Sequence, residues 1–148
     1  MIAMDNLIHY SQHRVLYGDT DAAAVVYNAN YLRYFEMGRT EFMRDRVCSY
    51  REIEQMGFVL PVIECHIRFK APARYDDLLT IETFLTDMKK VTCTFNYRIL
   101  QEEDSSRPRL LAKGFTTHAS VNKMGKLTPL PTEITDRLQP FLPPSPPQ

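Results

Sequence analysis

Four segments after residue 60 alternate apolar and polar residues, and this pattern constrains the fold more than any other feature. The clearest run covers residues 91–99, and similar runs cover residues 63–70, 79–85 and 115–121. Because successive side chains of a strand point to opposite faces, each run predicts a strand with one buried face. We expect a further strand over residues 8–17.

The links between the four later strands are short, at residues 71–77, 86–90 and 101–108. Short links favour antiparallel neighbours over crossover connections. The sequence therefore predicts one antiparallel sheet of about five strands.

In residues 30–47 the spacing changes, and apolar residues recur every three or four positions. This spacing predicts a long and largely buried helix. A short second helix is expected over residues 49–56, because Ser49 and Glu52 have capping-box spacing and Gly57 follows. We therefore predict an α+β fold with one long helix packed on the sheet, in a single domain over residues 1–139. The residues that define the long helix are Tyr31, Phe35, Gly38 and Phe42.

Composition narrows the function classes. The chain has 148 residues, and its 18 basic side chains equal its 18 acidic ones. A nucleic-acid partner is therefore not expected, because such proteins carry a basic excess. We expect neither a secretory signal nor a membrane span, since no window reaches the roughly 18 apolar residues that a span needs. Three cysteines without CxxC spacing favour reduced thiols and a cytoplasmic location: Cys48, Cys65 and Cys93.

The last nine residues, 140–148, contain five prolines. Proline removes backbone donors and favours polyproline II or no fixed structure. We expect an unstructured tail here, and binding to an SH3-like partner is the alternative.

Two carboxylates precede the long helix, at Asp19 and Asp21. The first N–H groups of a helix have no partner inside it, so a nearby carboxylate could attack or deprotonate while these amides stabilise an oxyanion. Asp is also favoured in turns and caps for local reasons. The residues alone leave a catalytic and a structural interpretation open.

Residues 19–31 (DTDAAAVVYNANY), followed by Arg39 and residues 40–42 in the helix, resemble the 4-hydroxybenzoyl-CoA thioesterase family and its YbgC-like acyl-CoA thioesterases. Residues 75–83 (YDDLLTIET) resemble the family's turn into its central strand, and the similarity covers about residues 10–122. The resemblance implies the hotdog fold, dimers or tetramers with active sites between subunits, and hydrolysis of an acyl-CoA or acyl carrier protein thioester.

The resemblance also implies roles for individual residues. Asp21 matches the catalytic carboxylate, as nucleophile or as general base, whereas Asp19 matches a variable and structural position. Oxyanion donors are expected from the backbone near Asn28 and near Leu60. The acyl pocket would include Tyr27, Tyr31 and Phe35, and the alternative for these aromatic residues is a place in the core.

The chain departs from the family pattern at two places. Asn28 stands where many YbgC-like relatives have histidine, so an imidazole role is absent here. Ala23 and Ala24 stand where glycine is common. Alanine at position 24 would be strained at positive φ and would fit a right-handed turn.

The resemblance implies that a few cationic side chains contact the phosphates of coenzyme A. The candidates are in loops, with surface solvation as the alternative for each. The sequence predicts neither metal nor cofactor, and the four histidines are expected to have surface or strand-packing roles. The candidate cations are Arg74, Lys89, Lys90, Lys123 and Lys126, and the histidines are His9, His13, His66 and His118.

Two other function classes compete with hydrolysis. A non-catalytic acyl-CoA binding or interaction module would use Asp21 only as a turn residue. A hydratase on the same scaffold is disfavoured, because no Asp-x-x-x-x-His run lies near the long helix.

Overall fold

The computed structural model describes residues 4–103 and 107–144. Seven strands, three α-helices and three 3-10 helices follow one another over this part of the chain. Their order is η1 (Met4–Leu7), β1 (His9–Arg14), η2 (Tyr17–Asp19), α1 (Asn30–Arg46), α2 (Tyr50–Gln55), β2 (Phe58–Val59), β3 (Val62–Phe69), β4 (Leu78–Met88), β5 (Thr92–Gln101), β6 (Arg109–Ala119), β7 (Val121–Asn122), α3 (Thr132–Leu138) and η3 (Gln139–Phe141).

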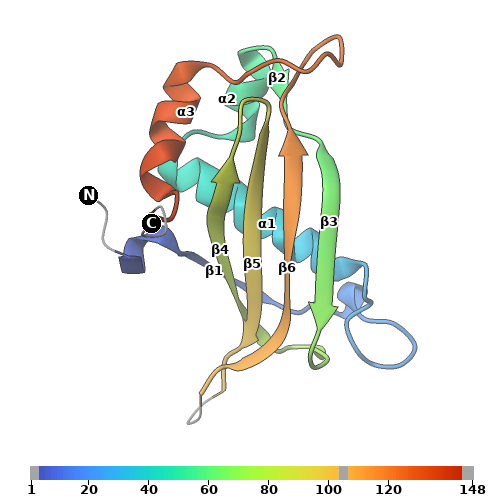
Figure 1. Cartoon of the computed structure of the whole chain (residues 1–148). Coiled ribbons are helices and arrows are strands. Elements are labelled where there is room, and N and C mark those ends of the chain that lie inside the picture. The colour runs from blue at the N-terminus through green and yellow to red at the C-terminus, as the bar shows by residue number, and fades with distance from the viewer. Residues whose placement is uncertain (1–3, 104–106, 145–148) are drawn as a thin grey trace.

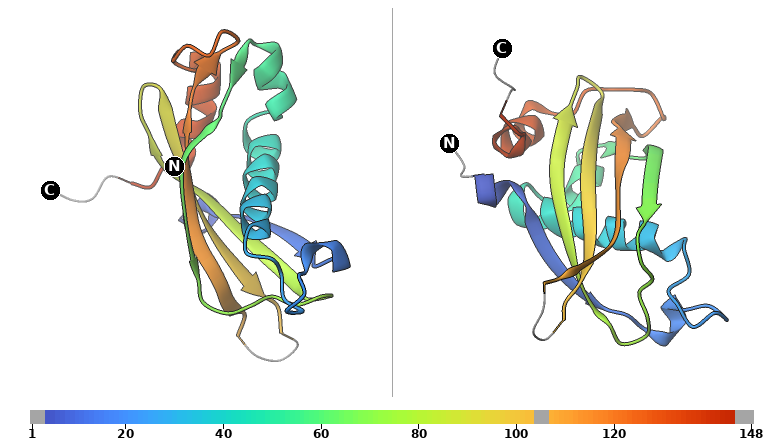
Figure 2. Two further views of the ribbon diagram at one scale, coloured as in Figure 1. Left: turned by 90° about the vertical axis from the view of Figure 1, so that its right-hand side faces the viewer. Right: turned by 60° about the horizontal axis from the view of Figure 1, so that its bottom comes forward.

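Five strands form one antiparallel sheet in the order β1-β4-β5-β6-β3, and β2 pairs with β7 beside it. The sheet curves around α1, which covers one of its faces (Figures 1 and 2). This arrangement confirms the predicted α+β fold with one long helix. β6 begins at Arg109, before the predicted residue 115, because alternation is lost where the pairing with β5 shifts register at Ile99 and Leu100.

Helix α1 presents its aromatic residues to the sheet. The ring of Phe35 stacks on that of Tyr97 in β5, with the ring centroids 4.2 Å apart. A Cβ at Gly38 would overlap the Thr83 hydroxyl oxygen, so the absence of a side chain permits the close approach of α1 to β4. The buried residues of the helix are Tyr31, Tyr34, Phe35, Gly38, Phe42 and Met43.

The second helix has the predicted capping box. Ser49 accepts a hydrogen bond from the Glu52 amide at 3.2 Å, and the Glu52 carboxylate accepts one from the Ser49 amide at 3.0 Å. Gly57 follows with a φ of 97°, a conformation that glycine adopts without strain.

The end of the chain differs from the expected unstructured tail. Residues 139–141 form η3, and the Phe141 ring packs edge-on against Phe42 at 5.7 Å. The Arg46 guanidinium lies 4.7 Å above the same ring. Pro140 therefore lies inside a short helix that is fixed by an aromatic contact, and Pro143 and Pro144 follow that helix. Residues 145–148 lie outside the described residues. Helix α3, which the sequence analysis missed, buries Ile134 and Leu138.

Strand β3 forms one edge of the sheet, and most of its residues are exposed. Ile63 is 57% exposed and Phe69 is 51% exposed. The predicted buried face of this strand is thus uncovered in the single chain. Over residues 4–103 and 107–144, no helix is both long and apolar enough to cross a membrane.

Candidate active site

The segment between η2 and α1 folds into a small closed loop. Thr20 and Val26 form an isolated antiparallel bridge, and the Asp21 amide donates to the Val25 carbonyl at 2.9 Å. Ala24 has a φ of 63°, so the turn needs the left-handed conformation that glycine adopts most readily. The departure from glycine at this position therefore introduces local strain.

Asp21 is exposed in this loop. Its Oδ1 atom accepts a hydrogen bond from the Ala23 amide at 2.8 Å, which is a local turn contact. Its second oxygen, Oδ2, has no hydrogen-bond partner among the residues that the structure describes. In the single chain the carboxylate is held by its own turn and remains open to solvent.

The start of α1 lacks a side-chain cap. Ala29 occupies the N-cap position, and the amides of Asn28 and Ala29 have no acceptor within the described ranges. Unpaired amides and the helix dipole give this end of α1 a partial positive charge. The loop of Asp21 leads directly into it.

A cleft of about 320 Å³ lies beside these amides. Tyr31 lines it and is buried, and its phenol oxygen accepts a hydrogen bond from the Ala73 amide at 3.1 Å. Burial raises the pKa of Tyr31, so the phenol stays neutral. Tyr27 and Asp21 do not line this cleft. The residues that do are Val26, Asn28, Tyr31, Phe69, Lys70, Ala71 and Pro72.

Lys70 is a cation of this cleft that the sequence analysis missed. The signal was present, because Lys70 is the last polar residue in the alternation of residues 63–70. Arg74 lies at the same end of the sheet, where its amide donates to the Asp77 carboxylate at 2.8 Å. Phe35 is buried in the core against Tyr97.

The other predicted residues lie at the far end of the sheet (Figure 1). Leu60 contributes to a small cavity together with Lys89 and Lys90. β4 has eleven residues, so at about 3.3 Å per residue this hairpin lies roughly 36 Å from the start of β4 near the Asp21 loop. Lys123 and Lys126 are in the turn after β7. A single chain therefore does not bring Leu60 or these lysines to Asp21.

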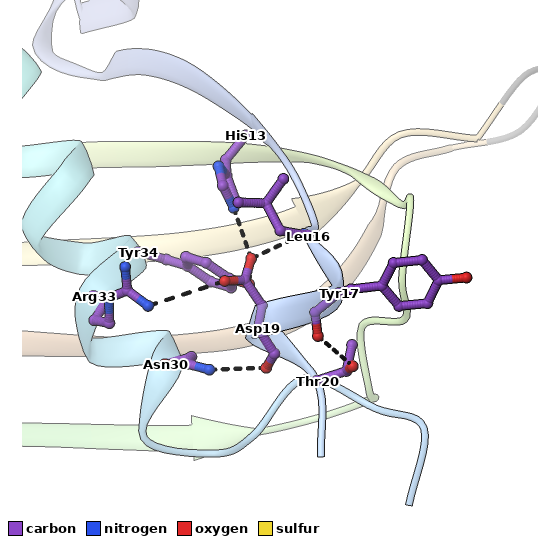
Figure 3. A network of polar contacts seen from close by, with 8 residues as sticks. All are labelled: His13, Leu16, Tyr17, Asp19, Thr20, Asn30, Arg33 and Tyr34. Carbon is purple, nitrogen blue, oxygen red and sulfur yellow. Dashed lines mark hydrogen bonds and ion pairs between the residues drawn. The ribbon is translucent and has the colours of Figure 1, made fainter. Parts of the chain in front are cut away.

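The side chain of Asp19, at the end of η2, accepts several hydrogen bonds just before the loop (Figure 3). It is 5% exposed, and its Oδ2 accepts hydrogen bonds from His13 Nε2, the Tyr34 hydroxyl and the Leu16 amide at 3.0, 3.0 and 3.1 Å. Burial raises the pKa of Asp19, but these hydrogen bonds outweigh burial and hold it below the usual value. The predicted structural role of Asp19 thus involves a buried, ionised carboxylate.

Three of the four histidines have buried or partly buried polar contacts. His9 pairs with Asp45 at 2.7 Å, and His13 with Asp19. His118 is buried in β6 and contacts the Leu60 carbonyl. His66 is exposed and stacks on Phe115.

A curved antiparallel sheet around one long helix, with a carboxylate loop at the start of that helix, defines the hotdog class of proteins. A family model described as the thioesterase-like superfamily matches residues 15–138. The chain is 34% identical over 126 residues to the acyl-CoA thioesterase YbgC of Haemophilus influenzae, covering 82% of this chain and 87% of that protein. The chain belongs to the thioesterase-like superfamily.

Two solved structures have the same architecture. A hypothetical protein from Aquifex aeolicus aligns with a TM-score of 0.80 and 31% identity, covering 88% of this chain and 98% of that one. A 1,4-dihydroxy-2-naphthoyl-CoA thioesterase from Synechocystis aligns with a TM-score of 0.80 and 26% identity, covering 89% and 96%. The family resemblance and the hotdog fold expected from the sequence are confirmed.

Proposed function

We propose that the protein hydrolyses the thioester of an acyl-CoA or aroyl-CoA, or of an acyl carrier protein, with Asp21 as the catalytic carboxylate. The observation that carries this proposal is the placement of an exposed carboxylate in the loop that leads to the uncapped start of α1, beside the cleft of Asn28 and Tyr31. Acyl-CoA thioesterase relatives such as YbgC support the reaction class.

The chemistry needs few groups. A thiolate leaves without strong acid help, so one carboxylate suffices, either by attacking the carbonyl carbon or by activating a water molecule. The amides of Asn28 and Ala29 are free to bind the oxyanion, and losing one such donor typically costs about 100- to 1000-fold in turnover. The dipole of α1 acts in the same direction.

A second copy of the chain would complete the site. β3 runs along the sheet edge from the Leu60 end to the end that holds Phe69 and the cleft. Two-fold antiparallel pairing of this exposed edge would place the Leu60 end of one subunit beside the Asn28 end of the other. The proposed active unit is therefore a homodimer, alone or paired into a tetramer.

The same pairing would gather the cations. Lys70 and Arg74 lie at the Asp21 end, whereas the four lysines of the far end would come from the partner. Together they would offer cations to the phosphates of coenzyme A or of a phosphopantetheine arm. The lysines in question are Lys89, Lys90, Lys123 and Lys126.

The experiment is thiol release from a series of acyl-CoA and aroyl-CoA substrates by the wild-type protein and by Asp21→Asn. We expect kcat to fall at least about 1000-fold in Asp21→Asn, because amide replacement removes both nucleophile and base. Asp136→Asn, at an exposed position of α3, is the matched control and should keep full activity.

Equal turnover by Asp21→Asn and wild type would refute the catalytic role of Asp21. Binding of acyl-CoA without hydrolysis by the wild type would instead support the alternative, a non-catalytic acyl-CoA binding module. The local bond of Asp21 to the Ala23 amide is the observation that keeps this alternative in the test. Unchanged thermal unfolding of both variants would show that the fold is intact.

A further inference from the structure

The carboxylate of Asp19 joins three elements that come together beside the candidate catalytic loop (Figure 3). One oxygen accepts from His13 of β1, from Tyr34 of α1 and from the Leu16 amide before η2. The Arg33 guanidinium lies 4.0 Å from the other oxygen. Asp19 is buried, whereas residues 21–24 are exposed, so the polar anchor of the loop is inside the protein.

The main chain of the same residue holds both ends of the loop. The Asp19 carbonyl accepts hydrogen bonds from the Tyr27 amide at 2.9 Å and from the Asn30 side-chain amide at 2.8 Å. Tyr27 directly precedes Asn28, whose amide is free, and Asn30 is the first residue of α1. Asp21 lies only two residues after Asp19. One residue therefore fixes the backbone on both sides of the proposed catalytic group.

We propose that Asp19 is a positioning residue: its ionised carboxylate, held by His13 and Tyr34, sets the distance between the Asp21 carboxylate and the free amides just before α1. This inference rests on the proposed thioesterase function. Asp19 itself does not reach the substrate, because its side chain is turned toward β1 and α1 and does not line the cleft.

The physical reason is the precision that catalysis requires. A displacement of about 1 Å between reacting groups can reduce a rate by about 100-fold, whereas substrate binding in the cleft involves other residues. Weakening the Asp19 anchor should therefore lower kcat and leave KM nearly unchanged. A role in stability alone would lower the unfolding temperature and spare the kcat of the folded fraction.

The groups that face the Asp19 carboxylate favour its ionised form, as this role requires. A neutral imidazole that carries its proton on Nε2 can donate to Asp19, as can a protonated one, and the Tyr34 hydroxyl donates as well. The titratable and charged groups near this carboxylate are His13, Tyr34 and Arg33. All three stabilise the ionised form of Asp19, because hydrogen bonds and ion pairs to a carboxylate are stronger than those to a neutral carboxyl group.

The decisive variant is Tyr34→Phe, which removes one donor and keeps the ring in the core. We expect kcat for an acyl-CoA substrate to fall about 10- to 100-fold, with KM within twofold of wild type and a cooperative unfolding transition. Tyr10→Phe is the matched control, because it removes the same hydroxyl from an exposed position of β1 and should leave kcat unchanged.

A second pair of variants tests the other donor. His13→Gln places an amide N–H near the position of Nε2, whereas His13→Leu has no donor. We expect His13→Gln to retain most of the wild-type kcat and His13→Leu to lose as much as Tyr34→Phe. Wild-type kcat in folded Tyr34→Phe and His13→Leu, or a rise in KM at constant kcat, would overturn the proposal.

The proposed function and this inference fail in different ways. If the wild-type protein hydrolyses no thioester, or if Asp21→Asn is fully active, the proposed function fails and the inference fails with it. If Asp21→Asn is inactive while Tyr34→Phe and His13→Leu keep wild-type kcat, only the positioning role fails.

Discussion

The Nδ1 atom of His118 lies 2.9 Å from the carbonyl oxygen of Leu60, and this contact determines which ring nitrogen carries the proton. A carbonyl only accepts, so Nδ1 donates and Nε2 is the acceptor of the neutral ring. Thr116 then donates to Nε2 at 2.8 Å, and the Tyr97 hydroxyl donates to Thr116 at 2.6 Å. A buried, directional chain of hydrogen bonds thus runs from the core to the loop of Leu60.

This chain makes stability depend on pH. Burial lowers the pKa of His118 from 6.5 to about 4. Between these values the unfolded state binds a proton that the folded state does not, so stability is complete above pH 6.5 and falls toward pH 4. The shift corresponds to about 3 kcal/mol. Urea unfolding of the wild type and of His118→Gln at several pH values measures this loss.

We expect His118→Gln to be less stable at neutral pH and to have a flatter pH dependence between pH 6.5 and 4. His66→Gln is the control, because His66 is exposed, and it should keep the wild-type slope. An identical slope in His118→Gln would exclude His118 as the source of the dependence.

Replacing Ala24 by glycine should stabilise the protein. The left-handed conformation costs an alanine about 1–2 kcal/mol, and glycine avoids this cost. The greater freedom of glycine in the unfolded chain offsets about 0.4–1 kcal/mol of the gain. We therefore expect a net stabilisation of about 0.5–1 kcal/mol in urea unfolding.

Ala23→Gly is the matched control for this change. Ala23 is the neighbouring residue and does not have a positive φ, so glycine there gains nothing and should destabilise the protein by about 0.4–1 kcal/mol. Equal effects of the two substitutions would show that the strain at Ala24 is negligible.

Lys70, which lines the cleft beside Asn28, provides a test of substrate recognition. We expect Lys70→Ala to raise KM for an acyl-CoA by about threefold to tenfold, as the loss of one exposed charge contact should. KM for the corresponding acyl-pantetheine, which has no phosphate, should stay constant. Lys113→Ala, at an exposed position of β6, is the control. Equal increases for both substrates would contradict a phosphate contact.

The spacing of apolar residues predicted the long helix and most of the sheet, because buried residues recur every three or four positions in a helix and every second position in a strand. Phe35 and Tyr97 follow helical and strand spacing, and each is buried where that spacing puts it. Ser49 and Glu52 are only three residues apart, so their capping box could also be predicted from the sequence. Strand β6 was predicted only from residue 115, because its alternation is interrupted before that point, where its pairing with β5 shifts register.

The candidate site was predicted only in part, for a similar reason. The resemblance predicts roles for Asp21 and Asn28, which lie in one continuous segment. The burial of Asp19 depends on His13, which precedes it by 6 residues, and on Tyr34, which follows it by 15. The sequence analysis gave His13 only a surface or strand-packing role. Leu60 is at the opposite end of the sheet, and no sequence pattern in one chain shows whether it lies beside the Asn28 end of a second copy.

The exposed edge of β3 should determine both assembly and activity. Ile63 is 57% exposed on this edge, and unpaired edge strands readily pair with another copy. We expect Ile63→Lys to convert the proposed wild-type dimer to a monomer in sedimentation velocity, because a lysine on an edge strand disfavours pairing with another copy. Thioesterase activity should fall with it, since the Leu60 end would come from the partner. Tyr10→Lys, on the opposite edge strand β1, is the control and should leave the assembly intact. A fully active Ile63→Lys monomer would show that each chain holds a complete site.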